Sequence, residues 1–280
     1  MSLAISSEKF THPLLKPILM ELTEYFKSAG ISFFVIGATA RDLIMELNQQ
    51  KSGRLTYDLD IAITVNDWDQ WQKVENEIVN LDNFKKDANQ KQRFTYKDKF
   101  ELDIVPFGAI MQQDSKIFWP PDNDFAMTVL GFDAAAKASL KVNIDQEIEI
   151  KIASLTGIFI LKIMAWMDRH LKTNKDADDI GFILENYLNI NDQRAAEQHY
   201  DKVYKKEQTE LTGGATLLGI DISEILKEYP SDLKTLKKLL TTELEKEDQS
   251  VLINQIIETH KRFSFEQVLA SLENIVNQLN

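Results

Sequence analysis

The chain is 280 residues long, 44% hydrophobic and 27% charged, and it carries a formal net charge of −12 at pH 7. These proportions are those of an ordinary globular protein, and the negative charge argues against nonspecific coating of nucleic acid, although a local basic groove is compatible with it. The absence of cysteine excludes disulfide bonds and thiolate zinc sites, and, because residues 1–8 do not resemble a secretory leader, we expect a cytoplasmic location.

Residues 1–153 are predicted to form a mixed domain of strands and helices. Apolar residues at helical spacing predict a helix over residues 14–27, Gly30 ends it, and residues 31–36 are typical of a buried strand. A helix is expected over residues 39–47, a loop over residues 51–54, and a further helix that Asn66 or Asp67 caps. Strands are also predicted at residues 57–63, 92–97, 100–106 and 147–152.

Residues 154–280 are predicted to form a helical domain. Residues 155–171 are apolar nearly all round, as in a buried central helix, but Lys162 interrupts the apolar run, which is too short to cross a bilayer. Amphipathic helices are expected over residues 175–188 and 233–244, with two more after them, and Gly213-Gly214 is predicted to be the clearest break. The fold class is therefore α+β, a mixed-sheet head with flanking helices followed by a mostly helical region, and no membrane partner is expected.

Two of the predicted strands carry carboxylates where apolar residues are expected. Asp58 and Asp60 are two apart and point to the same face of their strand, and Asp103 has apolar neighbours on both sides in another strand. Three carboxylates on adjacent strands repel one another unless a cation lies between them, so the pattern predicts a divalent metal site. The structural alternative is three solvated acids on edge strands. Oxygen ligands with no histidine or cysteine nearby suit Mg²⁺ or Mn²⁺ rather than zinc.

A glycine turn precedes the first of these acidic strands. The strand at residues 31–36 runs into Gly37-Ala38-Thr39-Ala40-Arg41, where a helix is expected to begin. A glycine at such a turn lets backbone amides approach a phosphate group, and the Thr39 hydroxyl and the Arg41 guanidinium would add contacts. A strand–glycine–helix turn alone is common and usually structural, but here it is followed by Asp-x-Asp and a later aspartate, which makes it specific.

This ordered set of a glycine turn, Asp58-x-Asp60 and Asp103 resembles the nucleotidyltransferases of the polymerase-β type. Further segments, over roughly residues 33–222, resemble the AbiEii/AbiGii toxin group of that superfamily. They are WPPD at 119–122, VLGF at 129–132, LK–AW–DR within 161–169, KDADDI at 175–180 and LLGID at 217–221. Two features depart from the pattern. Ala38 stands where glycine or serine is usual, and the gap from Gly37 to Asp58 is closer to that of tRNA CCA-adding enzymes than to that of minimal members.

The resemblance implies a nucleotidyltransferase-type head and a metal-assisted transfer of a nucleoside monophosphate from a nucleoside triphosphate (NTP) to an acceptor hydroxyl. Asp58 and Asp60 would hold Mg²⁺ or Mn²⁺ on the triphosphate, and Asp103 would help to hold a second ion that activates the acceptor. Gly37 and the amide of Ala38 would hold the pyrophosphate that leaves.

A second group of charged residues lies in the helical region. Lys162, within an apolar helix, either reaches the nucleotide phosphates, extends to solvent or pairs with an acid of the following helix. Asp176 and Asp179 are neighbours on that next helix. The resemblance makes them candidate catalytic residues, one of them as a base for the acceptor hydroxyl. The structural alternative is that acids in the first turn of a helix stabilise its dipole.

Three readings of the function stay open at the level of sequence. The resemblance favours an RNA end, such as that of tRNA, as the acceptor, with a toxin–antitoxin or phage-defence role and a cognate antitoxin as partner. A small-molecule acceptor, as in antibiotic-modifying nucleotidyltransferases, is the alternative among enzymes. A nucleotide-binding or partner-binding protein with a vestigial site is the alternative from another class, which Ala38 favours and the three clustered acids oppose.

Overall fold

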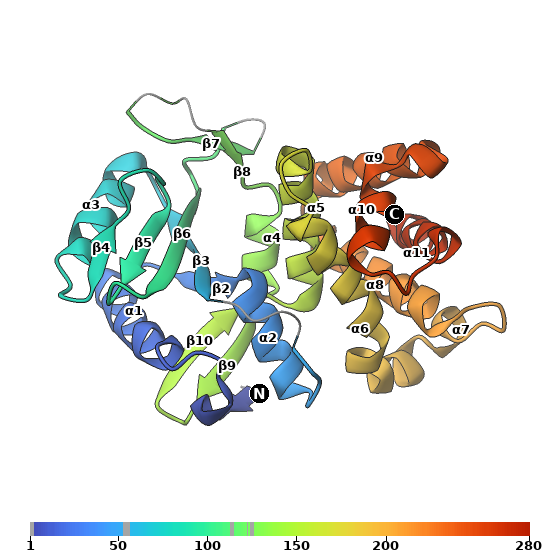
Figure 1. The fold of residues 1–280 in the computed structure, drawn as a ribbon, viewed down its shortest axis with the longest axis horizontal. Helices are drawn as coiled ribbons and strands as arrows, with labels where there is room; N and C mark the ends of the chain where they lie inside the picture. The colour runs from blue at the N-terminus through green and yellow to red at the C-terminus, as the bar shows by residue number, and fades with distance from the viewer. Residues whose placement is uncertain (1–2, 53–56, 113–114, 122, 124–125) are drawn as a thin grey trace. The chain divides into compact units, whose positions relative to one another are not determined.

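The computed structural model describes residues 3–52, 57–112, 115–121, 123 and 126–280 (Figure 1). It divides into two compact units, Met1–Ser154 and Leu155–Asn280, each of which is described by itself. The first unit is built on a mixed β-sheet and the second is helical, so the predicted α+β fold class is confirmed. The predicted loop at residues 51–54 falls partly outside the described residues, since Gly53 and Arg54 are not among them. Among the described helices, none is long and apolar enough to span a membrane.

The strands described in the first unit form an eight-stranded sheet in the order β1-β9-β10-β2-β3-β6-β5-β4, and two short strands, β7 and β8, pair separately. The strand β2 is antiparallel to β3, β3 is parallel to β6, and β6 is antiparallel to β5. The acidic strands are therefore direct neighbours at the centre of the sheet. The bounds are β1 Leu3–Ile5, β2 Phe33–Ile36, β3 Asp58–Val65, β4 Phe84–Lys86, β5 Arg93–Tyr96, β6 Phe100–Gly108, β7 Lys116–Phe118, β8 Ala126–Thr128, β9 Leu140–Ile144 and β10 Ile148–Ile152.

Alternation along β3 explains how the sheet combines a core with a polar face. Leu59, Ile61 and Ile63 are fully buried, whereas Asp58 and Asp60 are half-buried on the other face. The helices of this unit are α1 (Leu15–Ala29), α2 (Gly37–Leu47), α3 (Trp68–Val79) and α4 (Phe132–Lys137), with the short 3₁₀ helix η1 (Ser7–Lys9). As predicted, Gly30 ends α1 in the left-handed conformation, and Asp67 caps α3 by accepting a hydrogen bond from the Gln70 amide.

The second unit is a bundle of helices (Figure 1). Its elements are α5 (Leu155–Arg169), α6 (Lys175–Gln198), α7 (Tyr200–Val203), α8 (Glu210–Leu226), α9 (Pro230–Glu245), the 3₁₀ helix η2 (Glu247–Gln249), α10 (Val251–Thr259) and α11 (Phe265–Gln278). The predicted break at Gly213-Gly214 is wrong, because both glycines lie inside α8. An added Cβ at Gly214 would lie 3.1 Å from the Leu188 backbone nitrogen. An added Cβ at Gly213 would lie 2.8 Å from the Val203 carbonyl oxygen. Gly213 and Gly214 therefore allow close packing of α8 against α7 and α6 and do not form a turn.

Candidate active site

The three acids predicted from the sequence lie on one face of two adjacent strands. In the parallel pair β3–β6, Asp60 is in register with Asp103, and Asp58 is in register with Glu101. Residues in register on neighbouring strands point to the same side of the sheet. The face therefore carries four carboxylates in two rows of two. Glu101, which is exposed at the end of this array, was missed by the sequence analysis as a member of the site.

The glycine turn meets the array at Asp60. Ile36, the last residue of β2, is in register with Asp60, and α2 begins at the next residue. Gly37 has φ +65°, and a Cβ built on it would overlap the Asp60 Oδ2 atom. The lack of a side chain at Gly37 thus allows the first turn of α2 to approach the carboxylate, where the positive end of the helix dipole favours negative charge. Ala38 follows in the first turn of α2 and is buried.

Two predicted phosphate-binding side chains are engaged inside the fold. The Thr39 hydroxyl donates a hydrogen bond of 3.0 Å to the backbone carbonyl of Asp58. Arg41 is 1% exposed, and its guanidinium donates two hydrogen bonds, of 3.0 and 2.9 Å, to Asp42 Oδ1. Thr39 therefore ties α2 to the start of β3, and Arg41 is held within the first unit. A contact of either side chain with a phosphate stays a prediction.

Arg93 is a functional candidate that the sequence analysis missed. It lies on β5 directly opposite Asp103, and its Nε and Nη2 donate to the two oxygens of Asp103 at 2.7 and 2.9 Å. Its Nη1 lies 2.5 Å from Glu101 Oε2. The hydrogen bonds to Asp103, followed by the negative charge of Asp103, Glu101 and Asp58, raise the pKa of Arg93 despite its partial burial. A guanidinium therefore lies against two of these acids, and the predicted metal ion stays a prediction.

A sequence signal for Arg93 did exist. The predicted strands at 92–97 and 100–106 are separated by a very short connection, which is typical of a hairpin. Tyr96 is opposite Phe100, so counting three residues back from Tyr96 and three forward from Phe100 brings Arg93 opposite Asp103.

The donor set of this face fits a hard divalent cation. Its ligand atoms are carboxylate oxygens, the donors that Mg²⁺ and Mn²⁺ prefer, and four carboxylates face one guanidinium. Within the described ranges, no three acidic or histidine side chains already converge on one point as a finished metal site. Both oxygens of Asp103 are directed at Arg93. The predicted ligands Asp58, Asp60 and Asp103 are therefore neighbours, with Asp103 committed to an internal partner.

The second predicted group lies within the helical unit. Lys162 Nζ is 2.6 Å from Asp179 Oδ2 and 3.4 Å from Asp176 Oδ1. Arg169 Nε and Nη2 donate to the two oxygens of Asp176 at 2.7 and 2.8 Å. Asp176 and Asp179 are 0% and 1% exposed. Of the three outcomes expected for Lys162, the structure shows the pairing with acids of the following helix. Roles of these residues in catalysis stay predictions.

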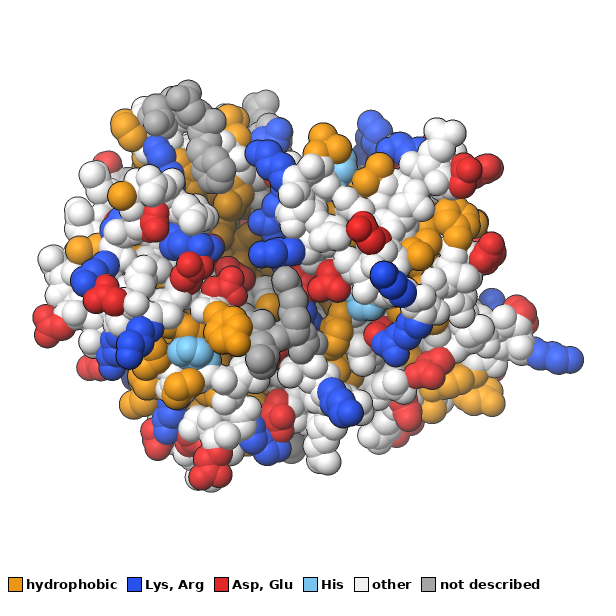
Figure 2. Space-filling model, viewed as in Figure 1, with side chains coloured by type: hydrophobic (Ala, Val, Ile, Leu, Met, Phe, Trp, Pro, Cys, Tyr) orange, Lys and Arg blue, Asp and Glu red, His pale blue; other side chains and the backbone are white. Residues whose placement is uncertain are grey.

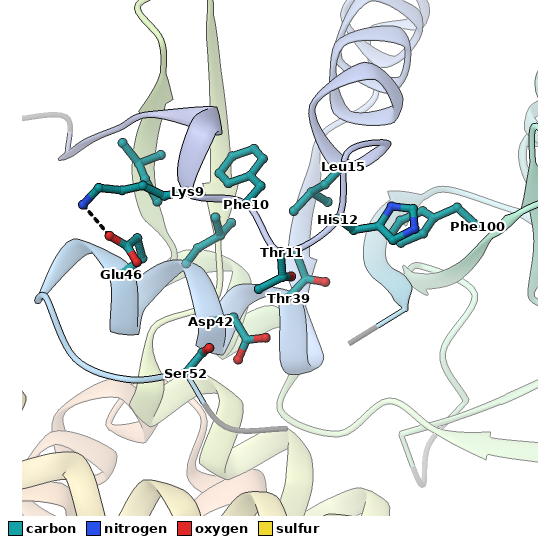
Figure 3. A pocket seen from close by; sticks show the side chains of 12 residues that line it. Lys9, Phe10, Thr11, His12, Leu15, Thr39, Asp42, Glu46, Ser52 and Phe100 are labelled. Carbon is teal, nitrogen blue, oxygen red and sulfur yellow. Dashed lines mark hydrogen bonds and ion pairs between the residues drawn. The ribbon is translucent and has the colours of Figure 1, made fainter. Parts of the chain in front are cut away.

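A small cavity lies beside α2 in the first unit (Figure 3). It measures about 40 Å³ and is lined by residues that include Thr39, Asp42, His12 and Phe100. The rings of His12 and Phe100 are stacked with their centroids 4.4 Å apart. Ligand pockets generally enclose roughly 300–1,000 Å³, so this cavity has room for a few water molecules and not for a nucleotide. The sheet face that carries the four carboxylates is the better candidate for the substrate.

Charge on the visible surface does not single out another site in the first unit. On the face of that unit seen in Figure 2, acidic and basic side chains are interspersed. The overall charge of −12 is therefore not gathered into one acidic patch there.

Comparison with known proteins gives one family and several distant structures. Residues 24–271 match the family model described as "Nucleotidyl transferase AbiEii toxin, Type IV TA system". No curated protein matches.

Three solved structures show distant likeness to this chain. An antigenic nucleotidyltransferase-like protein from Paracoccidioides brasiliensis is 17% identical, with 83% of this chain and 94% of that chain covered and a TM-score of 0.42. A tRNA-processing enzyme in its apo form I is 11% identical, with 95% and 75% covered and a TM-score of 0.31. The Thermotoga maritima CCA-adding enzyme in complex with tRNA is 12% identical, with 97% and 82% covered and a TM-score of 0.26.

Proposed function

The chain belongs to the AbiEii nucleotidyl transferase toxin family and is a nucleotidyltransferase, and from that premise we propose that it moves a nucleoside monophosphate from an NTP to an acceptor hydroxyl with Mg²⁺ or Mn²⁺ as cofactor. The observation that carries the proposal is the array of Asp58, Asp60 and Asp103 on one sheet face, with Gly37 directly against Asp60. The negative charge of Asp58, Asp60, Asp103 and Glu101 exceeds the single positive charge of Arg93, which supports the binding of a divalent cation at this face.

Each residue of the array has a part in this reaction. Asp58 and Asp60 would hold the cation that accompanies the triphosphate, and the amides of the first turn of α2, at Gly37 and Ala38, would bind phosphate oxygens. We assign Asp103 to the acceptor side, as the carboxylate in register with Asp60 on the next strand. When bound, the cation neutralises charge on the phosphates and makes the acceptor hydroxyl easier to deprotonate.

The bonds exchanged define what must be detected. The acceptor oxygen attacks the α-phosphorus and loses its proton, the bond from the α-phosphorus to the bridging oxygen breaks, and pyrophosphate leaves. Transfer of the α-phosphate label to the acceptor, with release of pyrophosphate, is therefore the signature of the activity.

We propose an RNA end, tRNA first, as the acceptor, and a role in a toxin–antitoxin pair with a cognate antitoxin as partner. The support is the description of the family as the toxin of a Type IV system. A transferase that arrests growth needs an acceptor on which the cell depends and which is abundant, and tRNA meets both conditions. An RNA acceptor and NTP together also fit the cytoplasm as the location.

The test is a transfer assay with purified protein, Mg²⁺, total tRNA and each α-labelled NTP in turn. The variant Asp58→Asn/Asp60→Asn is compared with the matched control Asp69→Asn/Asp82→Asn, which makes the same charge change at two exposed acids of the same unit. We expect label in RNA from the wild type and the control, and none from the site variant.

The other outcomes separate the remaining readings. Metal-dependent NTP binding without label in RNA points to a small-molecule acceptor. Absence of any metal-dependent NTP binding contradicts the enzyme proposal and leaves a vestigial site.

A further inference from the structure

Arg93 binds the carboxylate of Asp103, which is also a proposed metal ligand. Its guanidinium binds both oxygens of Asp103 in a two-pronged arrangement, at 2.7 and 2.9 Å. The Arg93 and Asp103 side chains are 19% and 14% exposed, so this ion pair is largely shielded from water. A metal ion that used the same carboxylate would have to share it with a fixed positive charge a few ångströms away.

Electrostatics makes that sharing unfavourable. A divalent cation and a guanidinium a few ångströms apart repel each other, and the repulsion is stronger in a partly buried site than in water. The two-pronged hydrogen bond also fixes the orientation of the carboxylate that the metal would use. Arg93 and a metal ion therefore compete for Asp103.

Glu101 offers Arg93 a second position. It lies two residues before Asp103 on β6, points to the same face, and is already 2.5 Å from Arg93 Nη1. Its side chain is 52% exposed, so it can follow the guanidinium toward solvent. Arg93 already contacts both carboxylates, so giving up Asp103 would leave it with a partner that is in place.

We propose that Arg93 is a positioning residue that occupies Asp103 while no metal ion is bound and moves to Glu101 when the ion arrives. The inference rests on the proposed function, because it takes Asp103 to be a metal ligand. Arg93 holds Asp103 until a metal ion binds, and Glu101 is needed as the second partner that releases Asp103. Arg93 would thereby weaken the binding of free metal ions at this site.

The test measures Mn²⁺ binding to the full chain without nucleotide, by electron paramagnetic resonance and calorimetry. Arg93→Gln removes the competing charge, and we expect the affinity for Mn²⁺ to rise about tenfold, the effect of roughly 1.4 kcal/mol. Arg93→Lys keeps the charge and should stay near the wild type. The matched control is Lys99→Gln, at the exposed turn of the same hairpin, which should leave the affinity unchanged within about twofold.

Glu101 is tested by a double-mutant cycle. Glu101→Gln should weaken Mn²⁺ binding in the wild type, because Arg93 loses its second position, and should have little effect when Arg93 is already glutamine. Weakening of equal size in both backgrounds would show that Glu101 acts through its own charge and would contradict the proposed exchange. Thermal unfolding of each variant confirms that it is folded.

The two proposals fail in different ways. Wild-type protein that binds Mn²⁺ and transfers label, with Arg93→Gln unchanged or weaker in binding, overturns the role of Arg93 and leaves the transferase intact. Wild-type protein that shows neither metal binding nor transfer overturns both. A purely structural Arg93 could lower stability, but it would not tighten the binding of a metal ion.

Discussion

Gly37 and Asp60 approach each other so closely that a Cβ on residue 37 would overlap the Asp60 carboxylate. Gly37, the first residue of α2, and Asp60 of β3 are therefore packed directly against each other. Gly37 and Asp58 are 21 residues apart in the sequence, and the antiparallel pairing of β2 with β3 brings the glycine turn and the Asp-x-Asp strand together.

Gly37→Ala should abolish most of the transfer activity. The new methyl group displaces Asp60, and a misplacement of about 1 Å near reacting groups can cost on the order of 100-fold in rate. The left-handed φ of +65° adds a strain of about 1–2 kcal/mol for alanine. The transfer assay and urea unfolding measure the two effects.

Gly30→Ala is the matched control for this prediction. Gly30 has nearly the same φ, +66°, but a Cβ there meets nothing within 4 Å. Gly30→Ala should therefore lower the free energy of unfolding about as much as the strain at Gly37→Ala does, with no loss of transfer activity. A Gly37→Ala protein as active as Gly30→Ala would show that the close approach to Asp60 is unimportant.

Thr39→Val should lower stability without changing the KM for NTP. The Thr39 hydroxyl donates to the Asp58 carbonyl and is 5% exposed, so valine removes one internal hydrogen bond, worth about 1 kcal/mol. Urea unfolding gives the first quantity and steady-state kinetics the second. Thr39→Ser keeps the hydroxyl and serves as control. A several-fold rise in KM with unchanged stability would instead support the predicted phosphate contact.

Lys162→Met should destabilise the helical unit by about 3–5 kcal/mol, because it breaks the ion pair of Lys162 with the buried carboxylate of Asp179. Asp179 lies 2.6 Å from the ammonium group, and Asp176 keeps Arg169. Arg169→Gln should cost less, since Arg169 is 50% exposed and Lys162 still lies 3.4 Å from Asp176. Both are measured by urea unfolding. Full stability of Lys162→Met combined with loss of transfer would favour a catalytic role for Lys162.

His260 should make the second unit more stable at mildly acidic pH. Burial lowers the pKa of His260, but hydrogen bonds to the Asp178 carboxylate and carbonyl outweigh it and raise the pKa above 6.5. A raised pKa in the folded state stabilises the fold fully below 6.5, and this contribution is lost as the pH rises through the folded-state value.

Urea unfolding at pH values on either side of this range measures the effect, which should disappear in His260→Asn and persist in His199→Asn. The control replaces a half-buried histidine at the end of α6. An identical pH dependence in His260→Asn and the wild type would show that another group titrates.

The central elements of the fold could be predicted because their signals are local. The strand at residues 31–36, the acidic strands and the apolar helix at 155–171 correspond to β2, β3, β6 and α5. The short strands β1 and β9 were missed, since three to five residues carry too little periodicity and their parallel pairing is a long-range contact.

The adjacency of the three candidate acids was predictable from the sequence, whereas the contacts of their side chains were not. Asp58, Asp60 and Asp103 stand out because acids in apolar strands are unusual, and their adjacency was expected from the pattern. That Asp103 is held by Arg93, and that Arg41 is buried, depends on register and packing that no short segment encodes. Gly213 and Gly214 show the same limit. A pair of glycines in a sequence usually indicates a turn, but these two lie inside α8 where neighbouring helices pack closely.

The hydrogen bond from Thr39 to the Asp58 carbonyl has a consequence for how such chains can vary over evolution. Together with the register of Ile36 and Asp60, it fixes the start of α2 against the start of β3, which are the two ends of the segment between the glycine turn and the acidic strand. Once those ends are fixed, doubling the length of a flexible connection costs only about 0.6 kcal/mol. Insertions and deletions between the glycine turn and the acidic strand can therefore accumulate among relatives without changing how Gly37 and Asp60 are placed.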